Sequence, residues 1–175
     1  MKITMHNGRS GSAVHNDRSW DPKKEHEKDY LIIPGRFLKE FWNDDKPLKK
    51  GKSKLEQSEL RLYEKLYKNH VKAVNDRYKK EGHKERTQTI DKIYRNERTR
   101  PEEQIFQLGK AGDTPNRDVF EKCLREYVST LEKEFTVRGG QAIVMDASIH
   151  YDETTPHAHI RFAYFGQDKD GNRMP

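Results

Sequence analysis

The spacing of apolar residues predicts two long helices. Residues 55–80 carry apolar side chains at intervals of three to four positions with charged residues between them, the pattern of an amphipathic helix. A second stripe runs from Val119 to Phe135, about five helical turns, and predicts a helix that buries one face against a sheet. Gly82 and Arg138-Gly139-Gly140 follow the two stripes and are typical of helix ends.

Shorter apolar segments predict strands. Residues 141–149 and 157–165 are apolar and rich in β-branched or aromatic side chains, and the turn-forming residues 152–156 join them into a hairpin. Residues 1–6, 30–33 and 103–108 predict three further strands, and residues 37–42 a short amphipathic helix. The predicted fold class is therefore α+β: an antiparallel β-sheet with helices packed on one face and a charged helical insertion at about 54–100.

The segment 83–100 is the most charged part of the insertion. Its only apolar anchors are Ile90, Ile93 and Tyr94, so it is interpreted as a helix lying on the protein surface or on DNA, and its role stays open. We expect one domain over residues 1–175. Because the sequence after the turn Asp170-Gly171 predicts the start of a new strand, we also expect the chain to be the N-terminal part of a longer protein.

Composition limits the core and suggests a partner. Only 31% of the residues are hydrophobic and 37% are charged, with a mean hydropathy of −1.20. The net charge of +6 favours a polyanionic partner, although a solvated lysine-rich surface would give the same charge. The single Cys123 cannot form an internal disulfide, and no apolar run reaches the length of a membrane span, so we expect a cytoplasmic protein.

Three histidines dominate the predicted hairpin. His157 and His159 point to the same face because the side chains of a strand alternate, and His150 ends the partner strand close to them. Three converging imidazoles with one open side are typical of a catalytic divalent-metal site; a polar or pH-sensitive cluster is the alternative. Imidazoles suit Zn, Mn, Co or Ni, whereas the neighbouring carboxylates favour Mn²⁺ or Mg²⁺ for phosphate chemistry.

The string His150-x-Asp-Glu-x-Thr-Pro-His-x-His159 resembles the metal motif of the Mob/Pre (MobV-type) plasmid mobilisation relaxases, members of the His-hydrophobe-His endonuclease superfamily. That family also has an HNxR motif near its N-terminus, and His15-Asn16-Asp17-Arg18 matches it. An earlier look-alike, His6-Asn7-Gly8-Arg9, is less well placed, because a glycine-containing segment precedes the motif in the family.

The resemblance implies a palm-like fold and a metal-dependent, site- and strand-specific DNA endonuclease and strand transferase. Such a relaxase nicks the transfer origin of a plasmid or mobile element for conjugative mobilisation, through a covalent 5′-phosphoryl–protein intermediate. The implied nucleophile is His15, which makes the intermediate a phosphohistidine. The roles implied for other residues are catalysis by Glu153 and Arg18, metal binding by His150, His157 and His159, and DNA binding by Arg9, Asn16, Arg18 and Arg161. The implied partner is single-stranded or hairpin DNA.

Several alternatives stay open. His6 or Tyr30 could replace His15 as the nucleophile. A metal-dependent phosphodiester hydrolase that uses water, or a non-catalytic basic DNA-binding module, would share many of the same features. A homodimer formed through sequence beyond residue 175 is also compatible with the sequence.

Overall fold

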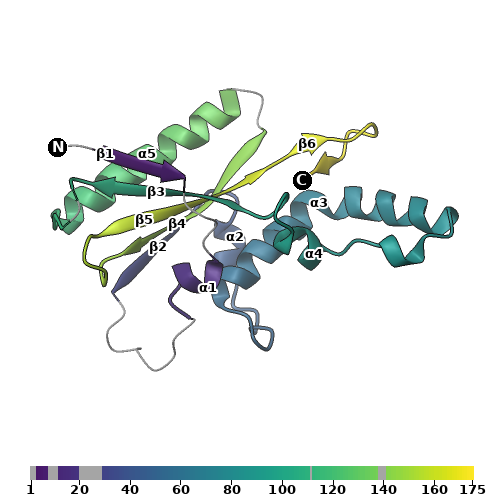
Figure 1. Cartoon of the computed structure of the whole chain (residues 1–175), viewed down its shortest axis with the longest axis horizontal. Coiled ribbons are helices and arrows are strands. Elements are labelled where there is room, and N and C mark those ends of the chain that lie inside the picture. Colours follow the sequence, from purple (N-terminus) through teal and green to yellow (C-terminus); the bar gives the residue numbers. More distant parts are fainter. Residues whose placement is uncertain (1–2, 8–11, 20–28, 111, 138–140) are drawn as a thin grey trace.

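A five-stranded antiparallel sheet forms the centre of the computed structural model, which describes residues 3–7, 12–19, 29–110, 112–137 and 141–175. The strand order is β1-β3-β5-β4-β2 (Figure 1). The strands are β1 (Ile3–Asn7), β2 (Tyr30–Pro34), β3 (Glu102–Leu108), β4 (Ala142–His150) and β5 (His157–Tyr164). A separate two-stranded ribbon consists of β6 (Gly166–Gln167) and β7 (Arg173–Met174). The predicted α+β class with an antiparallel sheet is confirmed.

The two long helices lie where the apolar stripes predict them. They are α3 (Lys54–Lys80) and α5 (Arg117–Val137), and the short helices are α1 (Ala13–Asn16), α2 (Lys39–Trp42) and α4 (Ile90–Arg95). Residues 83–100 do not form the single helix expected; they contain the 3-10 turn η2 (Lys84–Arg86) and then α4. The Asn75 side chain bonds the N–H and C=O of Gln88, and Thr89 caps α4 as a new helix, so the backbone turns between the two pieces.

Helices cover both faces of the sheet, more than the one face that the sequence predicts. The stripe of α5 packs against one face, with Phe120, Leu124 and Val128 against residues such as Phe106 and Ile160 (Figure 1). The first half of α3 packs against part of the opposite face; its apolar cluster joins Leu62, Tyr63, Leu66 and Tyr67 to Ile143, Met145 and Ala163.

A register shift in β4 decides what the α3 face carries next. The shift lies between Val144 and Asp146, which pair with Phe162 and Arg161 of β5. Beyond it, Ala147 and Ile149 point into the core under α5, so Asp146, Ser148 and His150 lie on the α3 face by alternation. On β5 the same alternation places His157, His159 and Arg161 there. On the face of the sheet covered by α3, the strand residues therefore change from apolar to polar at this register shift. The candidate site lies in the polar part.

The second half of α3 extends beyond the sheet, with η2 and α4 folded back along it (Figure 1). Ile93 and Tyr94 anchor α4 in the same apolar cluster as α3. Among the described residues, no helix is both long and apolar enough to cross a membrane.

Candidate metal and nucleophile site

The β4–β5 hairpin brings the three predicted strand histidines together. His150 and His157 are paired across the strands, and Ser148 is paired with His159 one step further in. The His150 ring lies 4.7 Å from the His159 ring and 5.6 Å from the His157 ring, between centroids. His150 is fully buried, His159 nearly so, and His157 half-buried. The hairpin geometry inferred from the sequence is thus present.

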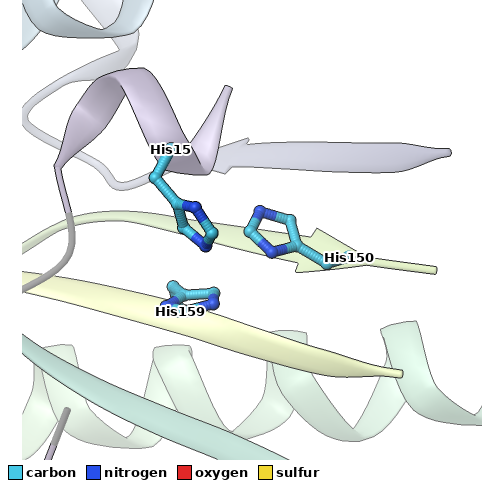
Figure 2. Close-up of side chains that lie close together, drawn as sticks. All are labelled: His15, His150 and His159. Atoms are coloured by element: carbon cyan, nitrogen blue, oxygen red, sulfur yellow. The ribbon is translucent and has the colours of Figure 1, made fainter. Parts of the chain in front are cut away.

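His15 reaches the same place from the N-terminal part of the chain. It lies in α1, whose first turn is capped by the Ser12 hydroxyl. Its ring centroid is 5.1 Å from that of His150 and 5.2 Å from that of His159. Figure 2 shows His15 descending from α1 onto His150 and His159, which rise from neighbouring strands. We call His15, His150, His157 and His159 the imidazole cluster.

The hydrogen bonds of the strand histidines fix which ring nitrogens carry lone pairs. His150 Nε2 lies 3.1 Å from the Asn16 carbonyl, and His157 Nδ1 lies 2.9 Å from the Thr155 carbonyl. A carbonyl only accepts, so both nitrogens carry hydrogen. His159 Nδ1 lies 2.8 Å from the Glu103 carboxylate and donates to it. Each ring is held by one nitrogen and offers the other, the arrangement found in metal-binding histidines.

The offered nitrogens have no satisfactory partner in the protein. Within the described residues, His150 Nδ1 is buried without a hydrogen bond. His157 Nε2 and His159 Nε2 face each other at 3.0 Å. Two lone pairs at that distance repel unless a proton or a cation lies between them. The donor set therefore fits a divalent cation.

Two overlapping groups of donors have all their ligand atoms within 4.8 Å of one another. One consists of His15, His150 and His159, and the other of His150, Glu153 and His157. Glu153 comes within 3.5 Å of His150 Nδ1 and 3.7 Å of His157 Nε2. The sequence predicts a catalytic role for Glu153, and the structure also places its carboxylate among the possible ligands.

Burial and neighbouring charge favour the neutral forms of His150 and His15. Burial lowers the pKa of His150 to about 3, helped by the positive charges of His159 and Arg18. The pKa of His15 is also lowered, first by burial and then by His159 and Arg18. Burial alone would raise the pKa of Glu153, but the hydrogen bond from Arg18 and the charge of His157 outweigh it and lower this pKa. Neutral imidazoles beside an ionised carboxylate can bind a cation or attack phosphorus.

Arg18 holds the hairpin connection and does not face an open phosphate site. Its side chain is 6% exposed, and its Nη2 donates to Asp152 and Glu153, both at 2.6 Å. The residue has a positive φ of 56°, which directs the side chain back onto the hairpin. In this structure Arg18 therefore fixes Glu153 beside the histidines, and its contact with DNA stays a prediction.

Two other predicted DNA contacts are also buried. Asn16 is 0% exposed; its amide donates to Glu103 at 3.2 Å. Arg161 is 2% exposed, and its Nε and Nη2 donate to the two oxygens of Glu59 at 2.7 and 2.9 Å. Burial and these internal bonds hold both side chains inside the protein, although Arg161 also lines a cavity beside α1; their contact with DNA stays a prediction. Within the described residues, the Asn16 Oδ1 is buried without a hydrogen-bond partner.

The alternative nucleophiles have different outcomes. Tyr30 is paired with His150 across β2 and β4, which places it on the same face at the edge of the cluster, and it is 38% exposed. Burial and the charge of Asp17 raise the pKa of Tyr30, which makes its phenolate scarcer at neutral pH. His6 lies in β1, where its backbone pairs with that of Ile105 in β3. Arg9, a predicted DNA contact, lies outside the described residues.

Sequence reasoning missed two glutamates that position the site. Glu103 binds both His159 and Asn16, and so joins the hairpin to α1. Glu59 of α3 binds Arg161, and the Tyr94 hydroxyl donates to the same carboxylate. We call Glu59, Tyr94 and Arg161 the Arg161 cluster. A signal was present for Glu59, since an acidic residue inside an apolar helical stripe needs a buried partner.

Comparison with known proteins gives one match. The model of the family Mob_Pre, described as plasmid recombination enzyme, matches residues 50–173. This range contains the hairpin histidines and Glu153 but not His15, whose place in the site rests on the geometry above. No curated protein and no solved structure matches the chain.

Proposed function

Because the chain belongs to the plasmid recombination enzyme family, a family of DNA-processing enzymes, we propose that it is a metal-dependent DNA relaxase. In this proposal it nicks one strand at the transfer origin of a plasmid or mobile element and stays joined to the 5′ end through His15. The observation that carries the proposal is the convergence of His15 on the strand histidines, where among the described residues His150 Nδ1 has no hydrogen-bond partner and the Nε2 atoms of His157 and His159 face each other.

The residues that would hold the cation are His150, His157 and His159, with Glu153 beside them. Each of the three imidazoles is oriented by a hydrogen bond on its other nitrogen. Arg18 holds the carboxylate of Glu153 in place. A carboxylate among imidazoles suits Mn²⁺, and a divalent cation there would draw negative charge from the scissile phosphate.

The proposed reaction uses His15 and Glu153 of the protein, with the cation acting on the scissile phosphate. An unprotonated nitrogen of His15 forms a bond to phosphorus, and the bond from phosphorus to the 3′ oxygen breaks. The imidazole gives up the proton on its other nitrogen, and the leaving 3′ oxygen takes up a proton. Glu153, whose negative charge acts on His15, is the proposed proton carrier. Attack by the 3′-hydroxyl on the phosphoramidate reverses these steps and rejoins the strand.

Three variants test this function. The wild-type protein, His15→Ala and Tyr30→Phe are incubated with Mn²⁺ and supercoiled origin DNA, and the products are separated in denaturing detergent. We expect wild type and Tyr30→Phe to give nicked circles with protein attached, and His15→Ala to give none. Attachment that survives in His15→Ala and disappears in Tyr30→Phe would transfer the nucleophile to the tyrosine.

The grouping of His15 with His150 and His159 favours one second candidate, a hydrolase in which His15 binds the metal and water attacks the phosphate. Such an enzyme would give nicked circles free of protein. In that case His15→Ala would reduce metal binding as well as nicking, whereas a nucleophilic His15 is dispensable for metal binding.

A further inference from the structure

The excess positive charge of the protein lies in one segment. Residues 68–100, which we call the arm, contain eleven Lys and Arg against five Asp and Glu, so they account for the whole net charge of +6. All eleven basic side chains are exposed. The arm is the second half of α3 with η2 and α4, which extends beyond the sheet in Figure 1. Like charges at this density repel, which makes a polyanionic partner the natural counterpart.

A groove runs along the arm between α3 and α4. Its volume is about 710 Å³, and Arg77, Lys92 and Arg95 are the basic residues that line it. Apolar side chains line it too, including Val74, Tyr78 and Ile93. The guanidinium of Arg77 lies 5.4 Å from the centre of the Tyr78 ring. The groove therefore combines apolar and aromatic surface with three basic side chains, against one acidic side chain, Asp91.

The arm groove continues toward the imidazole cluster. A second cavity of about 240 Å³, which we call the junction cavity, shares Arg95 with the groove and adds Arg100. Ser12, Ala13 and Val14, the three residues directly before His15, line the junction cavity too. Arg95 thus lines both the arm groove and the junction cavity, and the junction cavity adjoins α1, which carries His15.

We propose that the arm groove and the junction cavity bind the unpaired DNA strand on one side of the scissile phosphate. This inference rests on the proposed function and adds the path that the strand takes. Phosphates would contact Arg77, Lys92 and Arg100, while bases pack on the apolar and aromatic lining. A single strand exposes both its charge and its base faces, whereas a duplex buries the base faces and would leave the apolar lining unused.

Arg77 and Arg100 are the best residues to change. In the described part of the chain neither side chain forms an ion pair, so replacement leaves the fold intact. Arg95 is unsuitable because it bridges Glu56 and Asp91. Lys68 and Lys72 provide the matched control, since both are exposed on α3 and neither lines the groove.

Anisotropy of a labelled oligothymidylate of about 20 nucleotides, longer than typical single-strand site sizes, measures binding to the whole chain in EDTA. We expect Arg77→Gln/Arg100→Gln to weaken binding by roughly tenfold and to lower the salt slope by about 1.4, the value for two lost phosphate contacts. Lys68→Gln/Lys72→Gln removes the same charge and should change affinity by less than about twofold.

Equal losses in the two double variants, or binding by Arg77→Gln/Arg100→Gln as tight as in the wild type, would overturn the inference. So would a duplex of the same length that binds as tightly and responds to the same substitutions. Because EDTA prevents metal-dependent cleavage, binding is measured apart from nicking. If the wild-type protein binds the oligonucleotide in the groove but does not nick origin DNA, the proposed function is contradicted while the inference about strand binding still holds.

Discussion

Two polar clusters lie next to each other on the α3 face of the sheet, and they use their polar atoms in opposite ways. In the Arg161 cluster, the guanidinium donates to both oxygens of Glu59, and the Tyr94 hydroxyl donates to the same carboxylate. In the imidazole cluster, the strand histidines are each held by one nitrogen while the other is left for something else. The first arrangement fixes the structure; the second is completed only by a ligand.

Two carboxyl groups, those of Glu103 and Asp146, lie between the Arg161 cluster and the imidazole cluster. Glu103 is bonded to His159 and lies 3.7 Å from Arg161, so its charge serves both clusters. Asp146 is fully buried nearby, and burial together with the negative charge of Glu59 raises its pKa well above the usual value. Burial thus disfavours the charged form of Asp146, and the charge of Arg161 is balanced by Glu59 and Glu103.

The largest expected effect comes from breaking the Arg161 cluster on one side only. Glu59→Leu leaves a buried guanidinium without its bidentate partner, so we expect the free energy of unfolding to fall by about 3–5 kcal/mol. Glu59→Leu/Arg161→Met, which removes both charges, should recover most of that loss. Urea unfolding in EDTA measures all three proteins.

His157→Ala is the control from the other cluster. It removes a half-buried imidazole whose Nε2 faces the His159 Nε2 and lies 3.7 Å from the exposed Glu153, so we expect a loss below about 1 kcal/mol in EDTA. A loss as large as that of Glu59→Leu would show that the imidazole cluster is a stabilising element rather than a binding site.

Glu103→Gln sharpens the comparison at the boundary. The substitution keeps the shape but weakens the acceptor that orients His159, so we expect Mn²⁺ affinity to fall by about 10–100-fold. Glu102→Gln makes the same charge change one residue away at an exposed position and should leave the affinity unchanged. Isothermal titration with Mn²⁺ compares the two. Equal affinities would show that the bond to His159 has no part in metal binding.

The stability of the metal-free protein should also depend on pH. The pKa of His150 is about 3 in the folded state and near 6.5 in the unfolded state, so the unfolded chain takes up a proton first as pH falls. Stability is therefore fully present above about pH 6.5 and is lost toward pH 3, with a slope of up to about 1.4 kcal/mol per pH unit.

Urea unfolding in EDTA between pH 7 and pH 4 measures this slope. His150→Asn should flatten it, and His83→Asn, which removes a histidine of the arm, should not. An unchanged slope in His150→Asn would assign the acid sensitivity to other groups.

The sequence predicted the elements and the hairpin site well because both depend on local pattern. Apolar spacing located α3 and α5, and strand alternation placed His157 and His159 on one face. What it did not predict depends on long-range pairing. Arg161 alternates with His157 and His159 along β5 and so resembles a site residue. Its guanidinium is instead paired with Glu59 of α3, 102 positions away in the sequence. Asn16 and Arg18 belong to a motif that suggests phosphate contact. In the structure, however, Asn16 bonds Glu103 in β3, and Arg18 bonds Asp152 in the hairpin connection.

The most direct test of the central claim is the stoichiometry of Mn²⁺ binding to the wild type, His150→Ala and His15→Ala by isothermal titration. The account predicts one Mn²⁺ per chain in the wild type, loss of binding in His150→Ala, and retention in His15→Ala. Absence of binding in the wild type, or unchanged binding in His150→Ala, would contradict the metal site. Loss of binding in His15→Ala would make residue 15 a ligand and contradict its role as the nucleophile.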